Sequence, residues 1–109
     1  MTIQIPKPIA TYVDAYNSRD LNAALACFTE TAVVHDEGHE HRGRKAIGEW
    51  LRTTMEKYQP RLDAGKVEET EHVTVLAMTV SGTFPGSPVR LAFRFVIADD
   101  RIADLAIVP

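Results

Sequence analysis

Residues 12–38 read YVDAYNSRDLNAALACFTETAVVHDEG, and they indicate the fold class. Their first part continues a run of apolar residues at three- and four-residue steps, which is typical of one face of a helix. The members of this run are Ile5, Ile9, Tyr12, Val13 and Tyr16. A first helix is therefore predicted from Pro6 or Pro8 to about Tyr16, because proline is tolerated in the opening turn of a helix.

A second, short helix is predicted after Asp20, because an aspartate side chain accepts a backbone N–H at the start of a helix. Its buried face is expected to hold Leu21, Ala24, Leu25 and Phe28. Residues 29–31 are then predicted as a turn and residues 32–36 as a short strand. Residues 37–43, EGHEHRG, are polar and contain two glycines, which predicts a loop or a loose hairpin.

A third helix is predicted over residues 44–58, and Pro60 ends it. The last third of the chain reads as strands. Residues 61–70 carry Gly65, which indicates a bulge or bend, and residues 73–84 form the next strand. PGSP at residues 85–88 is a turn cluster.

Apolar and other residues alternate over residues 89–97, which predicts a half-buried strand with Arg90 and Arg94 on its outer side. Residues 101–108 complete the sheet. Helices followed by long antiparallel strands predict an α+β domain in which one layer of helices covers one face of the sheet.

The chain has 109 residues, enough for one domain over residues 1–109. Its net charge is −3 and it lacks a basic stripe, which argues against nucleic-acid binding. The single cysteine, Cys27, allows no intrachain disulfide and is expected as a buried thiol. No apolar run approaches the roughly 20 residues that cross a membrane, and the N-terminus lacks a signal-peptide pattern. We therefore expect a cytoplasmic protein that binds neither nucleic acid nor membranes.

The order of these segments resembles the nuclear transport factor 2-like superfamily, in its SnoaL-like and ketosteroid isomerase-like branch. The resemblance rests on residues 12–38, on RGRKAIGEWL at residues 42–51 and on FRFVIADDRIADLAI at residues 93–107. It implies a cone, in which a strongly curved antiparallel sheet carries three N-terminal helices on its concave face. It also implies a ligand pocket at one end of the cone and a homodimer through the outer face of the sheet.

Asp36 is the candidate general base. Strand alternation places Val34 and Asp36 on one side and His35 on the other. A carboxylate in an apolar pocket loses hydration, so its pKa rises and it can deprotonate a carbon acid. The resemblance implies the same role, because ketosteroid isomerase-like members carry a carboxylate at this point. The structural alternative is that Asp36 starts a turn by accepting a backbone N–H from Gly38 or His39.

Tyr12 is the candidate oxyanion donor. The resemblance implies that its hydroxyl binds the oxygen of a substrate carbonyl, and a buried phenol is a good donor because little water competes. The alternative is an aromatic core residue. Six further residues are expected to line the ligand pocket: Tyr16, Phe28, Val34, Trp50, Met55 and Phe93.

The chain departs from the isomerases at their second oxyanion donor, a protonated aspartic acid on a late strand. The corresponding segment offers only Val89, Arg90 or Leu91. Two hypotheses therefore stand. The first is a cofactor-free acid/base enzyme, an isomerase, dehydratase or cyclase, that acts on a small apolar carbonyl compound. The second is a non-catalytic ligand-binding or dimerisation module of the same fold.

Three histidines, His35, His39 and His41, are weak candidates for metal ligands, and they add a third hypothesis, a metal-dependent lyase or oxygenase. Imidazole is a common ligand of zinc, nickel and iron, but the spacing matches no closed metal site. A histidine could instead pair with Asp36 as an acid–base couple, because its pKa lies near neutrality. Since His35 points away, His39 or His41 would have to fold back. Proton transfer needs neither metal nor cofactor, and we expect none.

Overall fold

The computed structural model describes residues 5–109. Its helices are α1 (Lys7–Asn17), α2 (Leu21–Ala26) and α3 (Gly43–Tyr58). Its strands are β1 (Phe28–Asp36), β2 (His39–Arg42), β3 (Arg61–Glu69), β4 (Thr74–Ser81), β5 (Val89–Ala98) and β6 (Arg101–Val108). Residues 1–4 belong to the stretch in which we found no signal-peptide pattern, and they lie outside the described residues.

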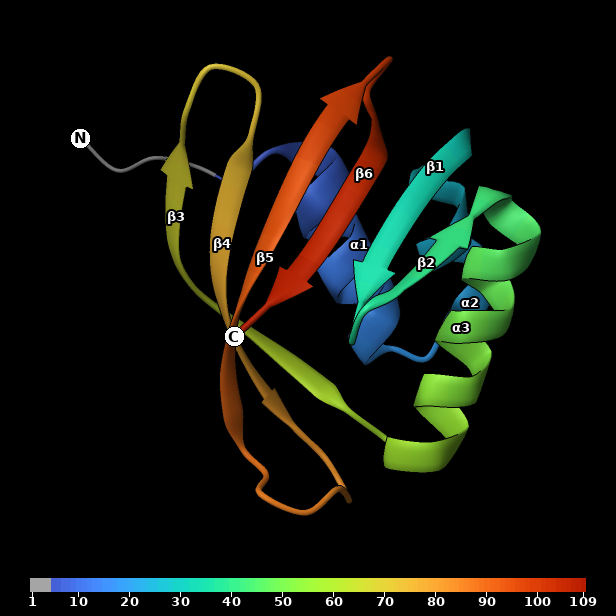
Figure 1. Ribbon diagram of the computed structural model, residues 1–109, viewed down its shortest axis with the longest axis vertical. Coiled ribbons are helices and arrows are strands. Elements are labelled where there is room, and N and C mark those ends of the chain that lie inside the picture. The colour runs from blue at the N-terminus through green and yellow to red at the C-terminus, as the bar shows by residue number, and fades with distance from the viewer. Residues whose placement is uncertain (1–4) are drawn as a thin grey trace.

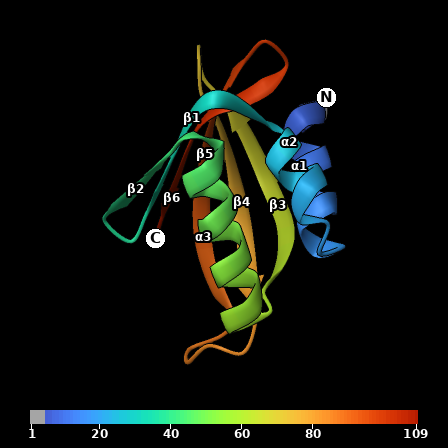
Figure 2. The same ribbon diagram turned by 90° about the vertical axis from the view of Figure 1, so that its right-hand side faces the viewer.

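The strands form one curved sheet in the order β2-β1-β6-β5-β4-β3. The helices lie on its concave side, with α3 beside β1 and α1 toward β3 (Figures 1 and 2). The predicted α+β cone is thus confirmed. One ladder differs from the antiparallel pattern, because β1 and β6 run parallel, with Val34 opposite Leu105. These two strands are far apart in the chain, so no hairpin turn forces them to run in opposite directions.

The first and third helices are confirmed to within a residue or so at each end, whereas α2 ends at Ala26, so Phe28, expected on its buried face, belongs to β1 instead. Pro6 is the N-cap of α1 and Pro8 lies in its first turn. The side chain of Asp20 accepts a hydrogen bond from the backbone N–H of Ala23 at 3.1 Å, so it caps α2 as expected. The third helix, α3, begins at Gly43, after the hairpin that precedes it.

The predicted turn at residues 29–31 is wrong, because β1 already begins at Phe28. Phe28 pairs with Ile102 of β6, and the Arg44 guanidinium donates two hydrogen bonds to its carbonyl, at 2.8 and 3.1 Å. The polar residues 29–31 lie where the register of the β1–β6 ladder shifts, between Phe28 and Val33. Their composition therefore reflects an irregularity within a strand and not a break between elements.

The segment at residues 37–43 is a hairpin, the second of the two forms predicted for it. β2 pairs with β1, and Asp36 lies opposite His39. Glu37 and Gly38 connect the strands with φ angles of 50° and 78°. Positive φ at both residues is what the tightest hairpin turns require. Asp36 is thus the last paired residue before a two-residue turn.

The core lies between the helices and the concave face of the sheet. Its largest fully buried side chains come from both layers: Ile9, Tyr12, Phe28, Val34, Ile47, Leu51, Leu76, Met78, Phe95, Ile102 and Leu105. Tyr12 packs edge-on against Phe28 and Phe95, with ring centroids 5.4 and 6.3 Å apart. Each such buried side chain contributes about 1.5–3 kcal/mol of transfer free energy.

The outer face of the sheet carries no helix from residues 5–109. Arg90 and Arg94 are exposed on it, as their alternation in β5 predicts. The expected irregularity at Gly65 is present, because the β3–β4 register shifts between Ala64 and Val67. Among the described residues, no helix combines the length and the apolar character needed to cross a membrane.

Candidate functional site

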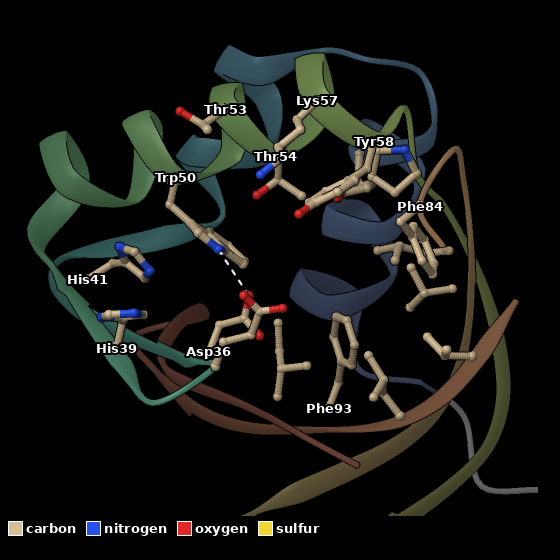
Figure 3. Close-up of a pocket in the computed structure, with 18 of the residues that line it drawn as sticks. Asp36, His39, His41, Trp50, Thr53, Thr54, Lys57, Tyr58, Phe84 and Phe93 are labelled. Atoms are coloured by element: carbon tan, nitrogen blue, oxygen red, sulfur yellow. Dashed lines mark hydrogen bonds between the residues drawn. The ribbon is translucent and has the colours of Figure 1, made fainter. Parts of the chain in front are cut away.

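A cavity of about 560 Å³ lies between α1, α3 and the concave face of the sheet (Figure 3). This volume falls in the range that holds a small organic molecule. The lining is mostly aromatic and aliphatic: Tyr12, Tyr16, Trp50, Tyr58, Phe84, Phe93, Leu62, Val80, Val89, Leu91 and Ile107. Polar groups also reach the cavity, from the β1–β2 hairpin on one side and from α3 on the other. An apolar body with polar groups at defined points would fit this space.

Asp36 reaches the cavity because of its place at the end of β1. Val34 is fully buried, and Asp36, two residues later, extends from the same side of the strand. His35 points to the other side, where its Nε2 lies 3.1 Å from Oδ2 of Asp104 in β6. The hairpin turn at Glu37 and Gly38 fixes the backbone directly after Asp36. The alternation read from the sequence therefore describes this strand correctly.

The carboxyl group of Asp36 accepts a hydrogen bond from Trp50 of α3. The distance from Trp50 Nε1 to Asp36 Oδ2 is 3.2 Å (Figure 3). Burial raises the pKa of Asp36 above its ordinary value, while the Trp50 N–H lowers it in part because it stabilises the charged form. Glu37 adds a further raising influence and His41 a lowering one. The result is a half-buried carboxylate that is more basic than one in water.

Tyr12 is fully buried in α1, and it belongs to the cavity lining. Among the described residues its hydroxyl has no hydrogen-bond partner. Burial, followed by Tyr16, Cys27 and Asp36, raises the pKa of Tyr12 well above its ordinary value. The phenol therefore stays protonated at any physiological pH. A buried donor without a partner costs about 1–3 kcal/mol, which a ligand oxygen would recover.

The three histidines lie on two different sides of the sheet. His35 lies on the outer side of the sheet with Asp104, whereas His39 and His41 line the cavity. The β1–β2 hairpin reverses the chain, and this brings His39 and His41 back toward Asp36. The His41 ring stacks on Trp50, with ring centroids 5.6 Å apart. Within residues 5–109, no three His, Cys, Asp or Glu side chains are grouped as a metal-ligand set.

Of the six further residues expected to line the pocket, Tyr16, Trp50 and Phe93 do so. The expectation for Phe28, Val34 and Met55 is corrected, because none of them belongs to the cavity lining. Phe28 and Val34 are fully buried in the core. Met55 packs against that core, on the face of α3 that also holds Ile47 and Leu51 at four-residue steps.

Sequence reasoning missed part of the α3 contribution to the cavity. The helix presents a second stripe that starts at Trp50 and continues at three- and four-residue steps: Thr53, Thr54, Lys57 and Tyr58. This spacing is itself a signal, because residues separated by three or four positions share a helix face. Phe84, from the turn before β5, had no comparable signal.

The β5 residues of the lining show what this chain has in place of the second oxyanion donor of the isomerases, an aspartic acid on a late strand. Val89 and Leu91 line the cavity, whereas Arg90 between them faces the outer side of the sheet. The strand therefore offers apolar side chains at this point. Asp36 and Glu37 are the carboxylates in the lining, and Glu37 is exposed in the hairpin turn.

Comparison with known proteins gives a family and a set of similar structures. Residues 9–105 match the family model described as a SnoaL-like domain. A candidate polyketide cyclase from Sinorhizobium meliloti is 35% identical, with 94% of each chain covered and a TM-score of 0.92. A comparison with curated proteins finds no match.

Two more distant structures show the fold alone. One is a candidate polyketide cyclase from Pseudomonas putida, 19% identical over 98% of this chain and 92% of that one, with a TM-score of 0.83. The other is a Catenulispora acidiphila protein with a ketosteroid isomerase-like fold, solved with trimethylamine. It is 16% identical over 97% of this chain and 87% of that one, with a TM-score of 0.84.

Proposed function

This chain belongs to the SnoaL-like family, and we propose that it is a cofactor-free acid/base enzyme acting on a small apolar carbonyl compound. The reaction class is an isomerisation, a dehydration or a cyclisation. One observation carries the proposal: the half-buried carboxylate of Asp36 and the buried side chain of Tyr12, whose hydroxyl has no hydrogen-bond partner among the described residues, belong to the lining of the same apolar cavity. A base and an oxyanion donor on one cavity are what enolate chemistry needs.

In this mechanism Asp36 removes a proton from the carbon next to the substrate carbonyl. The electron pair of the broken C–H bond forms the C=C bond of an enolate, and the negative charge moves to the oxygen. The neutral Tyr12 hydroxyl donates a hydrogen bond to that oxygen, where charge develops. Protonated Asp36 then returns the proton to another carbon or to a leaving hydroxyl. In a cyclisation the enolate carbon attacks a second carbonyl carbon, and protonated Asp36 gives its proton to the alkoxide oxygen that forms. No electron transfer occurs, so no cofactor is required.

The apolar lining supports the substrate class. Aromatic side chains from α1, α3 and β5 face the cavity, among them Tyr16, Trp50 and Phe93, and Phe84 joins them from the turn before β5. Low polarity around Asp36 weakens its hydration, and it strengthens the hydrogen bond from Tyr12 to a developing oxyanion. The S. meliloti protein is described as a candidate polyketide cyclase. That description agrees with a substrate that carries several carbonyl groups.

The test is turnover of a panel of aromatic and steroidal ketones and enones, followed by ultraviolet absorbance. Asp36→Asn is expected to lower kcat/KM by about 10²- to 10⁴-fold, because it removes the base while keeping the shape. Tyr12→Phe is expected to lower it by about 10- to 10³-fold, because it removes only the oxyanion donor.

Glu49→Gln is the control, since it removes a carboxylate that is exposed on α3 and lies outside the cavity lining. It should retain turnover within about threefold. Turnover that survives in Asp36→Asn would refute the assignment of the base. Binding of panel compounds without turnover, unchanged in Asp36→Asn, would indicate a non-catalytic ligand-binding module instead.

A further inference from the structure

The cavity has a second polar region on α3, which the acid/base chemistry does not use. Thr54 and Lys57 extend from the helix toward the cavity, and the Tyr58 ring lies beside them (Figure 3). Lys57 is the one lysine in the lining, which contains no arginine. The cavity therefore has acidic groups at the β1–β2 hairpin and a cationic group near the end of α3.

Lys57 is an exposed residue of the lining, and its ammonium lies beside an aromatic ring and is not neutralised. Its Nζ lies 5.1 Å from the centroid of the Tyr58 ring. That ring packs edge-on against Phe84, with centroids 5.8 Å apart. Within residues 5–109, no carboxylate lies within ion-pair distance of Lys57. An aromatic face attracts the ammonium but leaves its positive charge available to an anion.

The backbone under Lys57 and Tyr58 is fixed by the loop after β4. The backbone N–H of Thr83 donates to the Tyr58 carbonyl at 2.8 Å, and the Thr83 hydroxyl donates to the same carbonyl at 3.1 Å. These contacts tie the end of α3 to the segment that carries Phe84. A cation on a fixed helix end can select ligands by the position of their charge.

The helix sets the spacing between the two polar regions. Trp50, which bonds to Asp36, and Lys57 are seven residues apart on α3, so their backbones are separated by about 10 Å at about 1.5 Å per residue. The nearby charges that act on Asp36 are those of Glu37 and His41, from its own end of the cavity. An anion at Lys57 would thus lie apart from the Asp36 carboxylate.

We propose that Lys57, assisted by Thr54 and Tyr58, binds a carboxylate on the ligand, on the order of 10 Å from the atom that faces Asp36. The ligand is then an elongated aromatic or polycyclic keto acid, with its carbonyl at Tyr12 and Asp36 and its anionic group at the end of α3. The reactive half of this statement rests on the proposed function. The anion-binding half rests on Lys57 and its two neighbours and does not depend on Asp36.

The test uses a probe pair that differs only in charge. One probe is an acetylnaphthoate whose acetyl and carboxylate groups lie at opposite ends of the ring system, and the other is its neutral primary carboxamide. Titration calorimetry measures both affinities at low salt. Quenching of Trp50, the single tryptophan of the chain, reports entry into the cavity. The wild type is expected to prefer the carboxylate by about fivefold.

Lys57→Gln should bring this preference close to one, and Lys57→Arg should keep it. Lys45→Gln is the matched control, because Lys45 is an exposed lysine near the start of the same helix. It should leave the preference unchanged. An equal affinity for both probes in the wild type, a preference that persists in Lys57→Gln, or no binding of the carboxylate would overturn the proposal.

The binding measurement also separates this proposal from the proposed function. Asp36→Asn should retain or increase the preference for the carboxylate, because it removes a negative charge from the far side of the cavity. A Lys57-dependent preference in a protein without Asp36-dependent turnover would support the anion site and reject the enzyme. Turnover without that preference would support the enzyme and reject the anion site.

Discussion

The carboxyl group of Asp36 experiences two opposed influences from its surroundings. Burial favours its neutral form and raises its pKa, whereas the Trp50 N–H favours the charged form and lowers it. Burial is the larger influence. The hydrogen bond also limits the orientations that the carboxylate can take relative to the cavity. Trp50 therefore affects both the basicity of Asp36 and its direction.

Trp50→Phe is expected to raise the pKa of Asp36 further. Phenylalanine keeps an aromatic ring over the carboxyl group and beside His41, so burial is largely retained, but the N–H donor is lost. The acid limb of any activity that requires ionised Asp36 should move to higher pH. A ¹³C NMR titration of the carboxyl carbon measures the pKa directly, with Asp36→Asn to assign the signal.

The control for this experiment is Tyr58→Phe, which removes a polar atom from another aromatic residue of the cavity. It should leave the Asp36 titration unchanged. An Asp36 pKa that stays constant or falls in Trp50→Phe would contradict the role assigned to Trp50. Glu37 and His41, the other charged groups that act on Asp36, are the same in both variants.

For single residues, the sequence predicted the side of the strand on which a side chain lies better than it predicted the residue that the side chain contacts. Alternation along β1 was enough to place Asp36 and His35 on opposite sides, because a strand has a period of two. The partner of Asp36 could not be predicted, since the bond to Trp50 depends on how α3 packs against β1. The same packing divides the apolar residues of α3 into a core stripe with Met55 and a cavity stripe with Tyr58.

Between elements, Asn17 forms the most specific polar link. It lies in the last turn of α1, and its side-chain amide bonds to both backbone groups of Leu62 in β3, at 2.8 Å each. The amide donates to the carbonyl and accepts from the N–H. Leu62 is buried, so this pair of bonds satisfies backbone groups that water would otherwise have to reach.

Asn17→Ala is expected to lower the free energy of unfolding by about 2 kcal/mol, because two backbone groups of Leu62 lose their partner. Urea denaturation followed by circular dichroism measures the change. Asn22→Ala is the matched control, since Asn22 is exposed in α2 and has no comparable bond within residues 5–109. It should change stability by less than about 0.5 kcal/mol. Equal effects of the two substitutions would remove the special role of Asn17.

The elements themselves were largely predictable, because their signals are local. Apolar stripes, the Asp20 cap and Pro60 determine the helices within a few residues of sequence. The start of β1 was not predictable in this way, since Phe28 joins the sheet through a partner in β6, Ile102. A pairing over such a separation leaves no local pattern, so polar residues in the strand read as a turn.

The whole molecule leaves the outer face of its sheet without a helix from the described residues. At its centre Ala77 lies opposite Ala92, and Ala92 lies opposite Val108. Arg94 of β5 is exposed beside these small residues, and Asp104 of β6 lies on the same face. A centre of small residues with charges of both signs beside it is suited to pairing with its own copy about a twofold axis.

We therefore propose a homodimer through this face. Sedimentation velocity at micromolar concentration should give about twice the chain mass of 12.1 kDa. Ala92→Arg, at the centre of the face, should shift the protein to monomer by steric and charge repulsion. Ala98→Arg, an equally large change at the exposed end of β5, should not. A wild type that is monomeric at this concentration would refute the proposal.

The place of β6 in the sheet has a consequence for how the protein is made. Leu105 pairs with Val34 of β1 on one side and with Phe95 of β5 on the other, so β6 joins two groups of strands that otherwise share no ladder. A nascent chain leaves the ribosome from its N-terminus, so residues before 101 can form the β1–β2 and β3–β4–β5 ladders but not one continuous sheet. Asp36 and Phe93 thus come to lie on the same sheet only after β6 has emerged from the exit tunnel.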